Sequence, residues 1–370
     1  MMQSPQSANF PSFSVVMPCY NVAPFVGQAI RTVLDQQYDG DIQLVIVDDG
    51  STDNTWETIQ QIVTKEGAGK NILTIQHEQN KGVSVATDTG YQHATGEWII
   101  KADSDDIQLP GRCAAYADII KRHPDVCAIV LSCQRVTEDE KPLKKVPYCA
   151  KAYNDAKPEY ILRTPEERFN SRMGIGQQPG FYDLGGTAAI RRDLYDKWGN
   201  LWPKNGAEYR FSDDVVWGMR YMLSGTVIGS KAIACLYRTR SSGNLEYRSQ
   251  GLSYQNIKME ELLSAKSMMA KGEAYYQCRL ACERALNTPG LSDWEPEQIH
   301  QYIDKLRRYE LFFRRRSTWW HSSWFNRISW YIKHSKDLYP HHRGWCSCRL
   351  APLWLTCFLR AMLLRWRSKR

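Results

Sequence analysis

The sequence predicts an α/β fold in which helices cover both faces of a mostly parallel central sheet, followed by a helical, basic extension at the carboxyl end. Three observations support this prediction. Short apolar runs alternate with stretches of helical period over about the first hundred residues. Polar or acidic residues follow these runs, at the places where strands would end. The composition then changes sharply near residue 300, which predicts a separate carboxyl-terminal region.

Four apolar runs are expected to form buried parallel strands, because strand, helix and strand alternate at the spacing of right-handed βαβ units. The runs are Phe13–Met17, Ile42–Val47, Ile72–Ile75 and Trp98–Ile100. The helices expected between them are Pro24–Gln36, Asp53–Val63 (with Ser51 and Thr52 as cap candidates) and Val83–Thr95. Ligands of such sheets bind beyond the carboxyl ends of the strands. Tyr20, Asp48 and Asp103 all follow strands and are therefore expected at one edge.

The second half of the chain has a weaker pattern. A helix is expected from Pro110 to about His123, followed by a strand at Val126–Leu131. Residues 134–182 are polar and lack a clean period, so they are expected to form a long irregular excursion over the sheet. Regular structure is expected again at Gly185–Ile190, in a helix at Asp213–Ser224 and in a strand at Ile233–Tyr237.

Length and composition exclude several classes of protein. The 370 residues, 43% hydrophobic and 24% charged, can bury a large core and exclude a collagen, a coiled coil and a wholly disordered chain. The 11 cysteines are odd in number and irregularly spaced, which predicts reduced thiols in the cytoplasm. No secretory signal precedes Phe13, and residues 1–12 are expected to be disordered.

Three carboxylates lie within the four residues Asp103, Ser104, Asp105 and Asp106, directly after a predicted buried strand. Neighbouring carboxylates repel one another unless a cation or hydrogen-bond donors lie among them. Their oxygens suit Mg²⁺ or Mn²⁺, and Mg²⁺ takes one or two carboxylates together with phosphate oxygens. The cluster therefore predicts a divalent cation that binds a diphosphate. The alternative is an acidic turn that caps a helix.

A second acidic pair, Asp213 and Asp214, begins a predicted helix. Capping and the helix macrodipole explain such a pair without any function. Taken with the first cluster, the pair also offers a candidate general base. A positioned base that takes a proton from an attacking hydroxyl typically accelerates a reaction by about 10²- to 10⁴-fold.

Several motifs follow one another in a fixed order. They are Val15–Asn21, Val45–Asp53, Asn80–Gly82, Ala94–Ile99 running into the acid cluster, Ala189–Tyr195, and Asp213–Asp214 with Arg220. In this order the chain resembles the family 2 inverting glycosyltransferases, which use nucleotide sugars and have the Rossmann-like GT-A fold. The resemblance covers about residues 13–245. It implies a nucleotide-sugar-binding half at 13–110 and an acceptor-binding half at 111–245. A helical linker region is expected at 246–304.

The resemblance also implies roles for individual residues. Asp105 would ligate Mn²⁺ or Mg²⁺, and Asp103 would lie beside the metal and the ribose or diphosphate. Asp49, with Asp48 beside it, would recognise the nucleotide base, which is usually uracil. Asp214 would be the catalytic base, assisted by Asp213. The other donor-binding residues that the resemblance implies are Pro18, Tyr20, Asn21, Lys81, Ser104 and Arg240.

The chain departs from the family pattern at three places. Thr87 and Asp88 stand where the family usually has Arg-Asn, so one donor to the nucleotide is missing. Asp213 replaces the usual glutamate. Arg240 stands near the position of a histidine in many members; an arginine can neutralise phosphate but cannot ligate a cation.

Residues 305–370 form a basic, tryptophan-rich tail. The tail has 16 Lys and Arg against two acids and seven of the 13 tryptophans. Its most apolar run, Leu350–Leu364, contains Pro352 and Arg360 and is shorter than the roughly 20 residues of a membrane span. Tryptophan and arginine suit the headgroup zone, so docking on an anionic membrane surface is expected. Solvated or packed helices are the alternative, and no nucleic-acid partner is expected because no such motif is present.

The combined hypothesis is a cytoplasmic, metal-dependent inverting glycosyltransferase on the inner face of the membrane. It would move a sugar from a nucleotide diphosphate sugar, UDP-linked according to the resemblance, to a hydroxyl of a glycan or lipid-linked acceptor. The alternative is a non-catalytic module that binds a nucleotide sugar or glycan on the same fold. A nucleotidylyltransferase is a third reading, but the glycine- and basic-rich phosphate loop that it needs near the first strand is missing.

Overall fold

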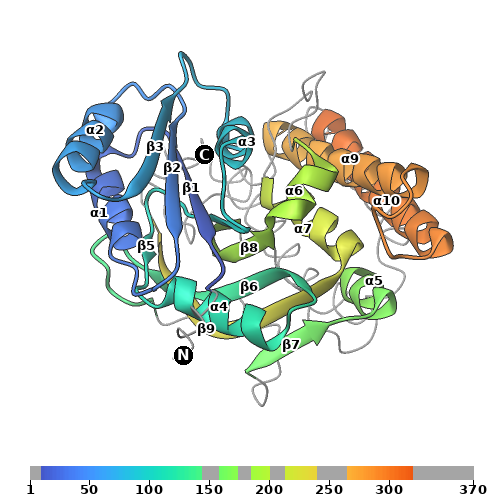
Figure 1. Ribbon diagram of the computed structural model, residues 1–370. Coiled ribbons are helices and arrows are strands. Elements are labelled where there is room, and N and C mark those ends of the chain that lie inside the picture. The colour runs from blue at the N-terminus through green and yellow to red at the C-terminus, as the bar shows by residue number, and fades with distance from the viewer. Residues whose placement is uncertain (1–9, 144–157, 174–184, 201–212, 240–264, 320–370) are drawn as a thin grey trace, which may run out of the picture.

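Four parallel strands form the first half of the sheet, as the sequence predicts. They are β1 (Phe13–Cys19), β2 (Ile42–Asp48), β3 (Asn71–Gln76) and β4 (Trp98–Lys101). Their spatial order is β3-β2-β1-β4, and β1 and β4 are buried along their whole length. The computed structural model describes residues 10–143, 158–173, 185–200, 213–239 and 265–319 (Figure 1).

Helices cover both faces of these strands. The helices α1 (Ala23–Leu34), α2 (Thr55–Glu66) and α4 (Arg112–Arg122) pack on one face, and α3 (Val83–Gln92) packs on the other (Figure 1). The prediction of Ser51 and Thr52 as caps of α2 is wrong, because the helix begins at Thr55 and Asn54 is its N-cap residue. The Ser51 hydroxyl instead donates to Asp48 at the end of β2.

The second half of the sheet is mixed. Its strands are β5 (Ile107–Gln108), β6 (Val126–Val136), β7 (Glu159–Leu162), β8 (Ala188–Arg191) and β9 (Thr226–Arg238). Strand β8 runs antiparallel between β4 and β6, and β9 runs parallel to β6. Within the described residues the sheet has nine strands. The predicted fold class, a mostly parallel α/β sheet with helices on both faces, is confirmed.

The prediction of an irregular excursion at 134–182 is wrong in part. The stretch contains the end of β6, strand β7 and helix α5 (Pro165–Met173). Helix α5 is mostly polar, and it buries few residues, among them Arg168 and Phe169. Because the buried face includes an arginine, no apolar periodicity marks the helix in the sequence. Residues 144–157 and 174–184 lie outside the described part.

Two long helices follow the sheet at the carboxyl end. Helix α9 (Ala265–Asn287) packs against α7 (Asp213–Ser224) and against α10 (Pro296–Trp319) (Figure 1). Helix α10 runs across residue 305, where the sequence analysis places the start of the tail, and it buries Ile303 and Leu306. None of the helices in the described ranges is long and apolar enough to cross a membrane.

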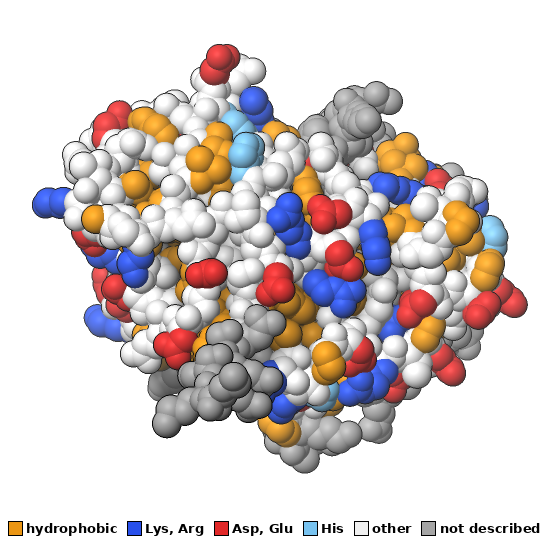
Figure 2. Space-filling view, in the orientation of Figure 1, with side chains coloured by type: hydrophobic (Ala, Val, Ile, Leu, Met, Phe, Trp, Pro, Cys, Tyr) orange, Lys and Arg blue, Asp and Glu red, His pale blue; other side chains and the backbone are white. Residues whose placement is uncertain are grey.

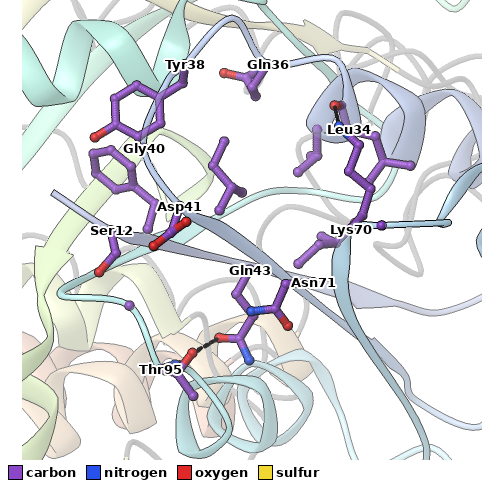
Figure 3. Close-up of a pocket in the computed structure, with 16 residues that line it drawn as sticks. Ser12, Leu34, Gln36, Tyr38, Gly40, Asp41, Gln43, Lys70, Asn71 and Thr95 are labelled. Atoms are coloured by element: carbon purple, nitrogen blue, oxygen red, sulfur yellow. Dashed lines mark hydrogen bonds between the residues drawn. The ribbon is translucent and has the colours of Figure 1, made fainter. Parts of the chain in front are cut away.

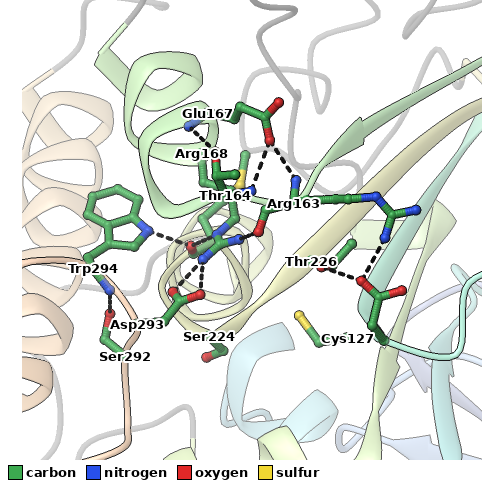
Figure 4. Close-up of polar contacts among 12 residues, drawn as sticks. Cys127, Arg163, Thr164, Glu167, Arg168, Ser224, Thr226, Ser292, Asp293 and Trp294 are labelled. Carbon is green, nitrogen blue, oxygen red and sulfur yellow. Dashed lines mark hydrogen bonds and ion pairs between the residues drawn. The ribbon is translucent and has the colours of Figure 1, made fainter.

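A buried arginine joins the carboxyl-terminal helices to the sheet domain (Figure 4). Arg168 of α5 is fully buried and donates to both carboxylate oxygens of Asp293, in the turn between α9 and α10. It also donates to the carbonyl of Met222 in α7 (2.9 Å), which accepts a second bond from the indole of Trp294 (2.9 Å). These contacts make the helical pair part of the same folded unit as α5 and α7.

We expect Asp293→Ala to lower the free energy of unfolding by about 3 kcal/mol, because it leaves the buried Arg168 guanidinium without its counter-ion. The matched control is Asp304→Ala. Asp304 is an exposed aspartate of α10 with a surface ion pair to Arg307 at 3.6 Å, and its loss should cost less than about 1 kcal/mol. Chemical denaturation measures both changes. Equal, small losses would show that the Arg168 contact does not hold the helices in place.

Candidate active site

The acid cluster lies directly after β4, at the carboxyl edge of the parallel strands. Its residues alternate in exposure: Asp103 and Asp105 are partly exposed, whereas Ser104 and Asp106 are buried. Ser104 faces inward to Cys19 of β1, whose thiol pKa is raised by burial. The two carboxylates predicted to bind metal are therefore the two that ligands can reach.

The buried acid Asp106 anchors the loop to the far side of the sheet. Its Oδ1 accepts the backbone N–H of Arg238 at the end of β9 (2.8 Å). Burial, together with the nearby charges of Asp105 and Asp103, raises the pKa of Asp106 well above its ordinary value. The Arg238 guanidinium donates in turn to the carbonyl of Asp105 (2.9 Å) and to Gln28 of α1 (2.8 Å). Arg238 thus fixes the loop that carries the accessible acids.

Asp103 is held between a lysine and a glycine. The Nζ of Lys101 lies 3.7 Å from its Oδ1. Gly186 in η2 (Gly185–Thr187) approaches its Oδ2 so closely that an added Cβ would lie 2.5 Å away. Arg112 of α4 keeps this arrangement in place, because it donates to the carbonyls of Gly186 (2.8 Å) and Lys101 (2.9 Å).

Asn21 and Asp48 organise the turns after β1 and β2. Asn21 has a positive φ of 51°, a conformation that asparagine tolerates better than most residues, and its Oδ1 accepts the N–H of Thr52 (2.8 Å). Asp48 is fully buried and accepts bonds from Ser51 (2.5 Å) and Gln76 (3.1 Å). Both side chains therefore bond to the protein itself at the edge where the sequence predicts donor binding.

Asp49 is also buried and bonded within the protein. Its carboxylate accepts the N–H groups of Lys81 (2.9 Å) and Gly82 (2.7 Å), and it pairs with Nδ1 of His77 (2.8 Å). His77 was not among the residues predicted for the site. Asp48 and Gln76 are register partners in β2 and β3, so Asp49 and His77, which follow them, are neighbours. The equal position of these two residues after their strands was the sequence signal that could have identified His77. Asp49 holds the turn that begins α3.

The remaining predicted donor-binding residues are Tyr20, Pro18, Lys81 and Arg240. Tyr20 is half-buried at the end of β1, Pro18 is buried inside that strand, and the Lys81 side chain is exposed. Arg240 lies outside the described residues.

Asp214 lies in the first turn of α7. It is half-buried, and its Oδ1 accepts the N–H of Val215 (2.9 Å). Helix α7, which carries the second acidic pair, contacts η2, the segment whose Gly186 lies against Asp103. Asp213 is the first residue of α7, and its side chain lies outside the described part.

Two arginines hold the chain where it leaves α6 (Arg192–Trp198). Arg220 of α7 donates to the carbonyls of Gly199 and Asn200, both at 2.9 Å, and Arg284 of α9 donates to the carbonyls of Lys197 (3.1 Å) and Trp198. Both guanidinium groups lie over the indole of Trp198, at 5.8 and 5.9 Å from its ring centre. Burial lowers the pKa of Arg220 to about 10. Helix α9 thus contacts the end of α6 through Arg284.

The donor set suits a hard divalent cation. Asp103 and Asp105 offer accessible carboxylate oxygens, which are the ligands that Mg²⁺ and Mn²⁺ prefer. The described residues contain no cluster of three or more His, Cys, Asp or Glu side chains placed to hold a metal. A Mg²⁺ ion held by one or two carboxylates commonly completes its coordination with phosphate oxygens and water.

A cavity of about 460 Å³ lies at the opposite, amino-terminal edge of β1, β2 and β3 (Figure 3). Three of the polar side chains that line it are bonded to the protein. Gln43 accepts from Thr95 (2.8 Å), Gln36 donates to Leu109 (2.8 Å) and Lys70 donates to Leu34 (3.2 Å). We assign this cavity no ligand. Acidic and basic side chains are interspersed over the face of the molecule shown in Figure 2.

A sequence model described as glycosyl transferase family 2 matches residues 14–199, half of the chain. The chain belongs to this family. An uncharacterized glycosyltransferase of Haemophilus influenzae is 38% identical over 98 residues, which are 26% of this chain and 38% of that protein. The minor teichoic acid biosynthesis protein GgaB of Bacillus subtilis is 34% identical over 121 residues, 32% of this chain and 13% of its own length. The matched region thus spans well under half of the length of each of these relatives.

A solved structure is similar to this chain beyond the residues that the family model matches. The crystal structure of S. aureus TarS 1-349 in complex with UDP-GlcNAc has a TM-score of 0.57 and 18% sequence identity, and the match covers 88% of this chain and 80% of that one. The chain therefore combines membership of glycosyl transferase family 2 with a GT-A-like fold.

Proposed function

We propose that the protein is a metal-dependent inverting glycosyltransferase that uses a nucleotide diphosphate sugar. One observation carries the proposal: Asp103 and Asp105 are the accessible carboxylates at the carboxyl edge of the parallel strands, fixed from behind by buried residues. That edge is where ligands of such sheets bind. Two carboxylates are also the number that Mg²⁺ takes beside a diphosphate.

The proposed reaction is a single in-line displacement at the anomeric carbon. Asp214 takes the proton of the acceptor hydroxyl, whose oxygen forms a bond to the anomeric carbon while the bond from that carbon to the diphosphate oxygen breaks. The nucleoside diphosphate leaves with the bonding electron pair, and the configuration inverts. A bound Mn²⁺ or Mg²⁺ supplies charge stabilisation of the leaving diphosphate. Asp103 and Asp105 would hold it.

We propose a UDP-linked donor and a glycan or lipid-linked acceptor. The UDP-GlcNAc complex of TarS supports the donor, and the teichoic acid role in the name of GgaB supports an acceptor of the cell envelope. A cytoplasmic location with the tail on an anionic membrane surface stays a prediction, since residues 320–370 lie outside the described part.

Donor turnover tests the proposal. With Mn²⁺, the protein should release UDP from UDP-GlcNAc above the rate of a protein-free blank even when water is the only acceptor, and EDTA should abolish the release. The same assay with other UDP sugars, GDP-mannose and dTDP-glucose identifies the donor if UDP-GlcNAc is the wrong sugar. Binding of a nucleotide without release from any donor would favour the non-catalytic binding module.

A further inference from the structure

Lys101 is a buried lysine at the end of β4 that the proposed mechanism does not use. Its side chain is 8% exposed, and its Nζ lies 3.7 Å from Oδ1 of Asp103. Lysines are almost never this buried unless they are paired, because transfer of the ammonium out of water costs free energy. The fold therefore holds a buried ammonium group beside Asp103, the first of the two accessible acids.

The register of the sheet shows where Lys101 projects. Lys101 is the β4 partner of Val16 in the parallel ladder with β1. Neighbouring partners in a ladder project to the same face of a sheet. Val16 lies under α3, where any side chain in place of Gly90 would collide with it. Lys101 therefore projects to the α3 face, at the carboxyl edge where Asp103 begins.

Helix α3 contributes no positively charged side chain to the face of the sheet on which Lys101 lies. It contains no lysine, arginine or histidine. Thr87, which stands at the position of the expected arginine, is fully buried, and its hydroxyl has no hydrogen-bond partner among the residues that the structure describes. Asp88 is buried as well and accepts a bond from the hydroxyl of Tyr195 (3.2 Å). Lys101 thus supplies a positive charge that the helix does not.

We propose that Lys101 is a donor-positioning residue, whose ammonium attracts the diphosphate of the bound nucleotide and fixes the Asp103 carboxylate at the edge of the site. The inference rests on the proposed function. A positive charge at this point favours the diphosphate and opposes a divalent cation, because the Coulomb energy changes sign with the ligand. Loss of the charge should therefore shift the two affinities in opposite directions.

The test uses the full-length Lys101→Met variant, which keeps the length of the side chain and removes its charge. The probe is whichever of UDP, GDP, dTDP and CDP binds the wild type. Without metal, we expect about 3- to 10-fold weaker binding of that nucleotide by calorimetry. Without nucleotide, we expect Mn²⁺ to bind more tightly by a similar factor, measured from the electron paramagnetic resonance signal of free Mn²⁺.

Two further variants separate this role from a structural one. Lys101→Arg keeps the charge and should restore both affinities toward those of the wild type. Lys70→Met removes a lysine at the opposite edge of the sheet, where its Nζ donates to Leu34, and should change neither affinity. Damage to the fold would lower the affinity for the nucleotide and the affinity for Mn²⁺ together.

The outcomes distinguish the inference from the proposed function. If the wild type binds a nucleotide and Lys101→Met leaves both affinities unchanged or lowers both, the role of Lys101 is wrong and the proposed function stands. If the wild type binds none of the four nucleotides with or without Mn²⁺, both fall.

Discussion

Asp214→Asn should abolish sugar transfer while the protein still folds and binds nucleotide. The amide cannot accept the proton of the acceptor hydroxyl, so we expect transfer to fall by about 10²- to 10⁴-fold, the usual contribution of a positioned base. Asp214 is half-buried in the first turn of α7, and Asn is also a good helix-start residue, so the helix should persist. Transfer is measured as sugar incorporation or donor turnover at saturating donor.

The matched control is Asp196→Asn. Asp196 is an exposed aspartate of the neighbouring helix α6, and its substitution should leave transfer and nucleotide affinity unchanged. Retention of at least a tenth of the wild-type transfer rate by Asp214→Asn would remove Asp214 from the role of base. Loss of nucleotide binding in the same variant would place Asp214 in the donor site instead.

Asp105→Asn should remove the effect of metal on nucleotide binding. An amide oxygen is a neutral and weaker ligand than a carboxylate, and even outer-shell partners of a metal are worth about 10- to 100-fold in affinity. We therefore expect Mn²⁺-dependent nucleotide affinity to fall by at least about 100-fold. Turnover should fall at least as far, because the proposed metal would stabilise the leaving diphosphate.

Asp118→Asn is the control for this experiment. Asp118 is an exposed residue of α4, where it pairs with Arg122 on the surface at 3.1 Å. Its substitution should leave the Mn²⁺ dependence intact. An unchanged response of Asp105→Asn to Mn²⁺ would locate the cation elsewhere.

The first half of the fold could be predicted because each signal is local. Strand β1 begins at Phe13 and β4 at Trp98, as the apolar runs indicate. The position of the acid cluster also follows from the sequence, since Asp103 comes two residues after the end of a buried strand. Such features need only the neighbouring residues in the chain.

The support of the site could not be predicted, because it depends on contacts between distant segments. Arg238 reaches Asp106 over 132 positions, and Arg168 reaches Asp293 over 125. No periodicity relates such pairs. The alternation of exposure within the acid cluster also escaped prediction, because a loop has no fixed period. Lys101 was visible in the sequence, but its burial beside the acid cluster depends on the register of β4 against β1.

We expect this edge of the sheet to bind a nucleoside diphosphate together with a divalent cation. The most direct measurement is the melting temperature of the wild type with UDP, GDP, dTDP and CDP, each with and without Mn²⁺. A ligand at 100 times its dissociation constant adds about 2.7 kcal/mol to the free energy of unfolding. We predict that one nucleotide raises the melting temperature and that the rise is larger with Mn²⁺. No rise with any nucleotide, in the presence or absence of Mn²⁺, would contradict the account.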